Sequence, residues 1–399
     1  KWDQILVHPV MGWMVLLSIL AGLFYTIFSV SGYPMDWIDG TFGWLGEQVE
    51  GRMAEGDFRD LITEGIIGGV GGVVIFLPQI LMLFFFIGIM ENTGYLARVS
   101  FMMDRLMSGV GLNGKAFIPV LSSYACAIPG IMATRTMESA RDRLITILVA
   151  PITSCSARLP VYLMLIALML PNGTDSERAM VMLGLYVLSI LGVYFFAWLF
   201  NRKLKKTETA LTVLELPTYQ RPSWREIGLQ IYDRGKIFVK NAGTVILCLS
   251  IILWALTTYP KSNSEDGSEQ LAHSVAGRMG KLIEPVIEPL GYDWKMGVGL
   301  VASFAAREVF VSTMSIIYIG EDATEEGDTV RDKMAAETRE DGKPAYNIRT
   351  CLSLLVFYVF AMQCLSTVAV TRRETNSWRW AIFQVVYLTG FAYVAALAT

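Results

Sequence analysis

The chain has 399 residues, of which 53% are apolar and only 17% charged, and its formal net charge is −3. Ordinary soluble domains carry about 25% charged residues. This composition excludes a disordered or collagen-like chain, and the small net charge argues against a nucleic-acid partner. The first hypothesis to test is that the chain spans a lipid bilayer.

Apolar segments as long as a spanning helix follow one another along the chain. Crossing about 30 Å of hydrocarbon takes roughly 20 mostly apolar residues. Two shorter apolar stretches, residues 115–134 and 295–318, carry polar residues in the middle. The pattern predicts an all-α polytopic membrane protein with about seven spanning helices, at residues 10–30, 66–90, 144–170, 180–200, 237–256, 351–370 and 380–397.

The charges of the connecting segments predict a topology. Residues 31–65 hold eight acidic side chains and only two Arg, which indicates an external loop, whereas the basic residues 201–236 indicate a cytoplasmic one. These assignments agree if residues 115–134 form a re-entrant hairpin that enters and leaves on one side. A full span at that place is the alternative. Backbone of this kind is tolerated at membrane depth when it is buried in protein or lines a cavity.

The same interpretation divides the chain into six parts. The two central ones are gate repeats, each with one re-entrant hairpin, and residues 321–349 form a charged loop. The predicted parts are a first span with its acidic loop (1–65), the first gate repeat (66–200), the basic loop (201–236), the second gate repeat (237–320), the charged loop (321–349) and the C-terminal spans (350–399).

An internal repeat appears when the sequence is compared with itself at an offset of 180 residues. Residues 112–134 then fall on residues 292–314 without a gap. The matches include charged residues outside the apolar runs, namely Arg98 with Arg278, Lys115 with Lys295, and Asp104 with Glu284. Duplicated halves with interrupted helices are typical of secondary transporters, and the loop charges favour an inverted repeat.

Two cysteines beside prolines are the strongest candidates for a metal path. Cys126 follows Ser122 and Ser123 and precedes Pro129, which disturbs a helix one turn back. Cys155 follows Ser154 between Pro151 and Pro160. Cys126 lies nine residues before the polar turn at residues 135–143 and Cys155 lies 12 residues after it. We therefore expect the two thiols at a shared depth of roughly 17 Å. Thiolate, hydroxyl and carbonyl ligands suit a borderline transition metal.

Charged residues inside apolar segments are further candidates. Arg307 and Glu308 lie in the interrupted stretch of the second repeat, where buried charges are costly and usually functional. Glu308 is predicted as a metal ligand or proton acceptor, and an ion pair with Arg307 is the structural alternative. Glu91 at the end of the second span is a weaker gating candidate, and Arg158 is a weaker candidate of the same kind. Cys364 is a lone thiol that packing alone would explain.

Other kinds of chemistry are poorly supported. The two histidines, His8 and His273, lie outside the predicted spans, so a histidine-based zinc hydrolase is excluded and a histidine-activated nucleophile is not expected. Residues 109–116 resemble a phosphate-binding loop but lack its final hydroxyl and a preceding strand. We therefore predict no GTP site in this chain.

At these residues the chain resembles the membrane domain of the FeoB family, the bacterial ferrous iron transporters. The matching stretches are GLNGKAFIPVLSSYACAIPGIMATR, RDRLITILVAPITSCSARLPVY, SFAAREVFVSTM and TRRETNSWRWAIFQVVY. The resemblance implies Fe(II) import across the bacterial inner membrane by a multi-pass protein. It also implies that Cys126 and Cys155 act along the iron path. Cys364 corresponds to a third family cysteine, before which most members have Pro where this chain has Gln363.

The resemblance also implies partners. The family carries an amino-terminal GTP-binding domain, which this chain lacks and which we expect as a missing or separate part, and a small cytoplasmic accessory protein. Assembly into a homo-oligomer is left open. The alternatives are a gate-type carrier of Mn(II), Zn(II) or a small solute, a membrane enzyme with Cys155 as nucleophile, and a scaffold or sensor that transports nothing.

Overall fold

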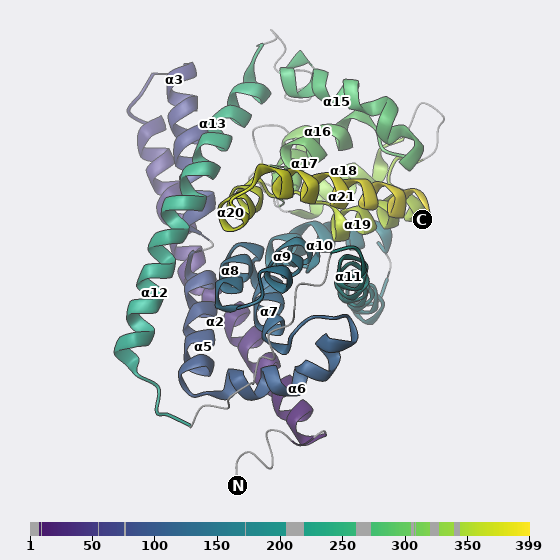
Figure 1. Ribbon diagram of the computed structural model, residues 1–399. Helices are drawn as coiled ribbons and strands as arrows, with labels where there is room; N and C mark the ends of the chain where they lie inside the picture. The colour runs from purple at the N-terminus through teal and green to yellow at the C-terminus, as the bar shows by residue number, and fades with distance from the viewer. Residues whose placement is uncertain are drawn as a thin grey trace. The chain divides into compact units, whose positions relative to one another are not determined.

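A computed structural model describes residues 8, 10–54, 56–75, 77–171, 173–204, 219–260, 273–304, 307, 309–319, 327–338 and 344–399. Over these ranges the chain is helical, without a β-strand (Figure 1). It divides into two compact units. Unit 1 comprises Lys1–Ala150 and Tyr194–Cys248, and unit 2 comprises Pro151–Val193 and Leu249–Thr399.

The helices of unit 1 belong to the first half of the chain and to the segment after residue 193. In chain order they are α2 (Met11–Glu50), α3 (Asp57–Asp60), η1 (Leu61–Gly68), α4 (Gly69–Val74), α5 (Leu77–Asn92), α6 (Tyr95–Gly109), η2 (Gly114–Ala116), α7 (Phe117–Ala125), α8 (Ala127–Ala133), η3 (Thr134–Thr136), α9 (Ala140–Val149), α12 (Trp224–Phe238) and η6 (Val239–Gly243). The unit boundaries fall inside α11 (Asp175–Lys203), inside α13 (Thr244–Thr258) and at the start of η4 (Ala150–Ile152).

The remaining helices belong to unit 2. They are η5 (Ser156–Arg158), α10 (Leu159–Met169), α15 (Val275–Ile287), η7 (Glu288–Leu290), α16 (Trp294–Ala302), α17 (Val309–Ile319), α18 (Gly327–Ala336), α19 (Ile348–Phe360), α20 (Leu365–Thr375) and α21 (Trp378–Leu397).

Six helical segments of the described chain are long and apolar enough to cross a membrane. They are Met11–Glu50, Asp57–Asn92, Ala140–Met169, Asp175–Lys203, Ile348–Thr375 and Trp378–Leu397, and each contains or overlaps one predicted span. The seventh predicted span, residues 237–256, is divided between the π-helix η6 and the 15-residue α13. The prediction of an all-α polytopic membrane protein is confirmed.

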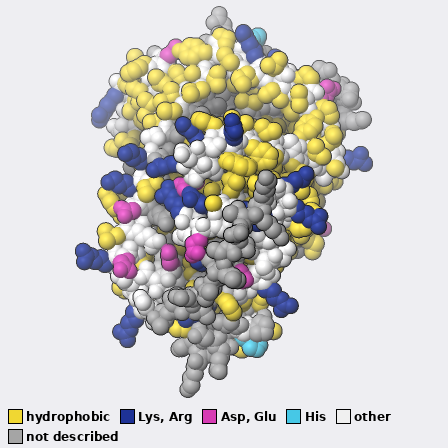
Figure 2. All heavy atoms as spheres, in the orientation of Figure 1, with side chains coloured by type: hydrophobic (Ala, Val, Ile, Leu, Met, Phe, Trp, Pro, Cys, Tyr) yellow, Lys and Arg dark blue, Asp and Glu magenta, His cyan; other side chains and the backbone are white. Residues whose placement is uncertain are grey.

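The surfaces of the spanning helices fit a lipid environment. On α11, Met180, Leu183 and Leu191 are 60–73% exposed, and on α21 Val386 and Val394 are 62–63% exposed. Hydrophobic side chains cover much of the surface in view (Figure 2). Soluble monomers rarely expose contiguous apolar surface of this kind, so these faces are suited to contact with acyl chains.

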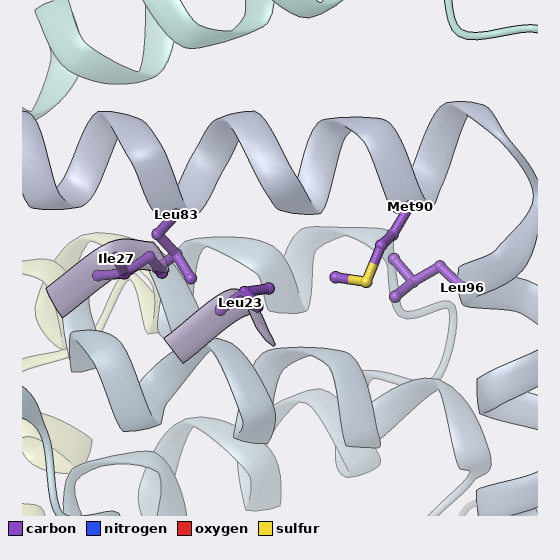
Figure 3. Packing of buried hydrophobic residues seen from close by; sticks show 5 residues of the cluster. All are labelled: Leu23, Ile27, Leu83, Met90 and Leu96. Carbon is purple, nitrogen blue, oxygen red and sulfur yellow. The ribbon is translucent and has the colours of Figure 1, made fainter. Parts of the chain in front are cut away.

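A buried cluster holds the N-terminal helix against its neighbours in unit 1. Leu23 and Ile27 of α2 pack with Leu83 and Met90 of α5 and with Leu96 of α6 (Figure 3). These five side chains are 1–8% exposed. Full burial of each is worth about 1.5–3 kcal/mol relative to water.

The first interrupted stretch forms two short helices that pack side by side. α7 has nine residues and α8 has seven, with Cys126 between them. At 1.5 Å per residue neither reaches half of a 30 Å hydrocarbon layer. A Cβ on Gly130 would lie 1.9 Å from Ser123 Oγ and 2.7 Å from the Pro119 carbonyl oxygen, so only Gly permits this approach of α8 to α7. The hairpin interpretation is therefore favoured over a full span.

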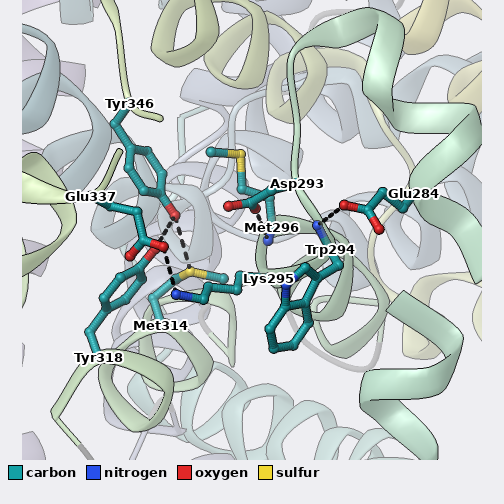
Figure 4. A network of polar contacts seen from close by, with 9 residues as sticks. All are labelled: Glu284, Asp293, Trp294, Lys295, Met296, Met314, Tyr318, Glu337 and Tyr346. Atoms are coloured by element: carbon teal, nitrogen blue, oxygen red, sulfur yellow. Dashed lines mark hydrogen bonds and ion pairs between the residues drawn. The ribbon is translucent and has the colours of Figure 1, made fainter. Parts of the chain in front are cut away.

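Two backbone details recur at the offset of 180 residues, as the predicted repeat requires. Gly111 and Gly291 both have positive φ, 78° and 81°. The residue three places after each glycine donates its N–H to a carboxylate of the preceding helix. In the first repeat Gly114 donates to Asp104 at 2.8 Å. In the second repeat Trp294 donates to Glu284 at 3.2 Å (Figure 4). Corresponding residues thus make corresponding contacts.

In each repeat the lysine at the corresponding position also forms an ion pair with a glutamate. Lys115 Nζ lies 2.8 Å from Glu138 Oε1, and Lys295 Nζ lies 2.7 Å from Glu337 Oε1. Near the second pair, the hydroxyl groups of Tyr318 and Tyr346 lie 3.3 Å apart (Figure 4). Burial raises the pKa of Tyr346 well above its ordinary value.

Three predicted loops contain helix, and those predictions are wrong in that respect. In the acidic segment 31–65, helix α2 continues as far as Glu50. This part of the segment contains one proline, Pro34, and its aromatic and apolar residues continue the helix. Residues 224–236 of the basic segment belong to α12. The charged segment 321–349 contains α18, and its Glu337 pairs with Lys295. Charge alone does not interrupt a helix, since Glu, Lys and Arg are good helix formers.

Candidate functional site

Cys126 occupies the break of the first hairpin. It is the single non-helical residue between α7 and α8, with extended backbone at φ −156° and ψ 134°, and it is partly exposed. Ser122 Oγ donates to the Ile118 carbonyl at 2.9 Å and Ser123 Oγ donates to the Pro119 carbonyl at 2.8 Å. Both hydroxyls keep their lone pairs, but Ser123 lies against Gly130, so packing accounts for it.

We call the interruption between α9 and α10 the first break, and Cys155 lies in it. The helix narrows to the 3₁₀ turn η4 at Pro151, and Cys155 then adopts extended backbone at φ −76° and ψ 164°. Pro160 stands in the first turn of α10, where its missing N–H costs no hydrogen bond. Pro129 stands likewise in the first turn of α8. The prolines begin new helical segments at the breaks.

Ser154 is fully buried beside Cys155 and is held on two sides. Its Oγ lies 3.2 Å from the Tyr162 hydroxyl, and its N–H donates to Ser189 Oγ at 3.0 Å. Ser189 Oγ donates in turn to the Ile152 carbonyl at 3.0 Å. This network fixes the backbone immediately before the thiol.

Arg158 holds the carbonyl groups that the first break leaves outside the helix. Its side chain is completely buried and donates to the carbonyl oxygens of Pro151, Ile152 and Thr153 at 3.0, 2.9 and 2.8 Å. Hydrogen bonds to a charged donor contribute about 1.5–3 kcal/mol each. The guanidinium therefore stabilises the unwound backbone that presents Cys155.

We call the interruption between α19 and α20 the second break, and Cys364 lies in it. Its backbone is extended at φ −162° and ψ 101°, and residues 361–364 are not helical. Arg307 of the second hairpin donates to the carbonyl oxygens of Ala361 and Gln363, both at 3.3 Å. Within unit 2, Cys364 lies close enough to Cys155 for an electrostatic interaction.

The sequence reasoning assigned too little weight to two of these features. Arg158 was predicted only as a weaker candidate, because a sequence does not reveal which carbonyls a break leaves free. The equivalence of Cys155 and Cys364 was missed because they are 209 residues apart, not 180. A signal exists: Cys155 follows the N-cap Ser139 by 16 residues, and Cys364 follows the N-cap Asn347 by 17.

The other predicted residues fall into two groups. Glu308 lies outside the described residues. Glu91 is exposed and accepts a hydrogen bond from Gln230 Nε2 at 3.1 Å, within unit 1. In the part of the chain that the structure describes, no three His, Cys, Asp or Glu side chains gather as a metal centre. Of the predicted thiol pair, Cys126 belongs to unit 1 and Cys155 to unit 2.

Two family models match the chain. The Gate model, described as nucleoside recognition, covers residues 73–169 and 239–378, which is more than half of the chain. The chain belongs to the Gate family. A second model, described as the C terminus of ferrous iron transport protein B, matches residues 182–234.

Individual relatives agree with this assignment. The chain is 46% identical to the Fe(2+) transporter FeoB of Leptospira interrogans, over 98% of this chain and 58% of that protein. It is 34% identical to the Fe(2+) transporter FeoB of Campylobacter jejuni, over 99% of this chain and 64% of that protein. The predicted resemblance to FeoB is confirmed, and the chain spans about six tenths of the length of these relatives. No solved structure matches it.

Proposed function

We propose that the chain forms the ion path of an Fe(II) importer in the bacterial inner membrane. The observation that carries this proposal is the placement of three thiols, Cys126, Cys155 and Cys364, each as the extended residue directly before a new helical segment. The choice of Fe(II) as the transported ion is supported by relatives named Fe(2+) transporter. Fe(II) is the substrate here and is not a resident cofactor.

The chemistry of the breaks fits such a cargo. Sulfur ligands select transition metals over Mg(II) and Ca(II). Ser122 and Ser154 add hydroxyl oxygens one to four residues from a thiol. The described residues contain no complete metal centre.

The remaining parts of the transporter belong to this proposal as well. We assign nucleotide hydrolysis to a GTP-binding domain outside this chain, and Glu308 to a role as a further Fe(II) ligand. A relative in Porphyromonas gingivalis is named a fusion of Fe(2+) transport protein A with FeoB, and 38% identity over 99% of this chain supports an accessory protein of that kind. Gate opening would be a movement of one repeat relative to the other.

The test is Fe(II) uptake by the full-length protein in liposomes under reducing conditions. We expect Cys126→Ala and Cys155→Ala each to lower uptake at least tenfold at low Fe(II). Cys351→Ala is the matched control, because Cys351 is a fully buried thiol in the first turn of α19, away from the breaks, and its replacement should leave uptake unchanged.

Two results would contradict the proposal in different ways. Unchanged uptake by the double variant Cys126→Ala/Cys155→Ala would refute the thiol path and leave transport intact. Uptake of Mn(II) or Zn(II) in preference to Fe(II) by the unaltered protein would refute the assignment of the cargo.

A further inference from the structure

The break before Cys364 contains buried polar atoms that make no hydrogen bond. They are Arg307 Nη1, Tyr358 Oη, Gln363 Nε2 and Oε1, and Ser366 Oγ. The four side chains are 0–4% exposed. At least nine tenths of buried polar groups in proteins have a partner. Several exceptions around one break indicate that these side chains bind something other than protein.

The four side chains belong to one neighbourhood of unit 2. Arg307 donates to the carbonyl of Gln363 itself and to that of Ala361. The Tyr358 hydroxyl lies within interaction range of Ser303, Gln363 and Arg307, and with none of them does it form a hydrogen bond of good geometry. Ser366 stands in the first turn of α20, two residues after Cys364.

Among the residues that the structure describes, the charge of this neighbourhood is positive. The guanidinium of Arg307 is a cation, and no carboxylate of the described residues pairs with it. The 11-residue helix α20 begins here and adds the positive end of its dipole. Four of the five unbonded atoms can donate a hydrogen bond. A divalent cation would be repelled by this set, and a small anion would be attracted.

The corresponding break before Cys155 has no such set. Three of the Arg158 hydrogen bonds go to carbonyls of the break, and the hydroxyl of Ser154 faces that of Tyr162. Of these side chains, Arg158 leaves only its Nε without a partner. The difference belongs to the second break and not to the breaks in general.

We propose that the second break binds a small monovalent anion of the chloride type. Arg307 Nη1, Gln363 Nε2 and the hydroxyls of Ser366 and Tyr358 donate to it, and the N-terminus of α20 faces it. The bound anion neutralises the Arg307 charge close to Cys155 and Cys364. Fe(II) then meets less repulsion at Cys155, a consequence that rests on the proposed function, whereas anion binding itself does not.

Anion binding is tested first on the purified full-length protein in detergent. Thermal unfolding is followed by tryptophan fluorescence while chloride replaces gluconate at constant ionic strength and pH. We expect Tm to rise saturably with chloride. In Gln363→Leu and Ser366→Ala the half-saturating chloride concentration should increase at least tenfold, because each variant removes a donor to the anion.

Gln384→Leu is the matched control. Gln384 is a fully buried glutamine of α21, and its Oε1 accepts a hydrogen bond from Thr371 Oγ1 at 2.8 Å. Its loss should lower Tm without changing the chloride dependence. A chloride-independent Tm of the unaltered protein, or an equal loss of dependence in Gln384→Leu and Gln363→Leu, would overturn the anion site. Crystals soaked in bromide should show an anomalous peak beside Gln363.

The link to transport is measured separately by Fe(II) uptake in liposomes. Replacing chloride by gluconate on both sides should raise the KM for Fe(II) about tenfold with little change in kcat. A saturable rise of Tm with an unchanged KM would retain the anion site and refute its effect on Fe(II). Absence of uptake under both conditions would count against the proposed function alone, since the Tm measurement does not depend on transport.

Discussion

The two repeats begin alike and differ at the break that follows. Each starts with a glycine at positive φ, a carboxylate that caps the hairpin and a lysine paired with a glutamate. In the first repeat, Arg158 binds carbonyls five to seven positions away, within the same break. In the second repeat, Arg307 binds carbonyls 54 and 56 positions away, so the second hairpin stabilises the segment that follows another helix, α19.

This difference teaches which part of each repeat is able to move alone. The first break is stabilised by Arg158, which lies within it, so its shape does not depend on the position of the first hairpin. The second break depends on the hairpin, since Leu365 N–H also donates to the Phe304 carbonyl at 3.1 Å. Displacement of the second hairpin would release both contacts together. We therefore expect conformational change to involve Cys364 more than Cys155.

The largest difference is expected from removal of the two arginines. Arg158→Leu leaves three buried carbonyls without a donor and should cost about 3–5 kcal/mol, as for other broken buried charge networks. Arg307→Leu loses two longer hydrogen bonds and should cost about 1–3 kcal/mol. Arg158→Lys should not restore stability, because an ammonium group lacks the planar fork of donors.

The measurement is thermal unfolding of the full-length variants in one detergent at one chloride concentration. Arg158→Leu should have the lower Tm. A lower or equal Tm for Arg307→Leu would show that the second break, and not the first, is the more strongly held.

A second comparison tests the turns that begin the hairpins. Alanine at φ near +80° costs about 1–2 kcal/mol, so both Gly111→Ala and Gly291→Ala should destabilise the protein. At Gly111 the new Cβ would also lie 1.6 Å from Asn201 Nδ2. The side-chain Oδ1 of Asn201 accepts a hydrogen bond from Arg141, so moving this side chain has a further cost.

The extra cost at Gly111 is isolated by a double-mutant cycle. Gly111→Ala should be less destabilising in an Asn201→Ala background than in the unaltered protein, as measured by the midpoint of thermal unfolding. Equal effects in both backgrounds would mean that backbone strain alone accounts for the destabilisation by Gly111→Ala. Backbone strain alone is what we expect for Gly291→Ala.

The sequence predicted the parts of this architecture that depend on local pattern. Pro129 and Pro151 mark the breaks at Cys126 and Cys155, and the match of Lys115 with Lys295 reveals the repeat. The helix up to Glu50 was missed, because loop charge was given more weight than helix propensity. The hydrogen bonds of Arg158 and Arg307 to backbone carbonyls were missed for another reason. A guanidinium binds to free carbonyls wherever the packing of the chain places them, and the sequence does not show where that is. Inserted residues between α17 and α19 shifted the register and concealed the correspondence of Cys155 with Cys364.

The smallest difference is expected at the two lysine–glutamate pairs. Lys115 and Glu138 have 32% and 63% of their side chains exposed, so Lys115→Met should change stability by less than about 0.5 kcal/mol. Lys295 and Glu337 are 21% and 23% exposed, and Lys295 Nζ also lies 5.0 Å from the centre of the Tyr318 ring. Lys295→Met should cost about 1–2 kcal/mol through the charged hydrogen bond and the cation–π contact.

Thermal unfolding at low and high ionic strength separates the pairs, since salt should weaken the exposed pair more. Glu337→Gln should reproduce most of the Lys295→Met effect. Identical Tm values for Lys115→Met and Lys295→Met at both ionic strengths would mean that Glu337 does not hold its segment on the second hairpin.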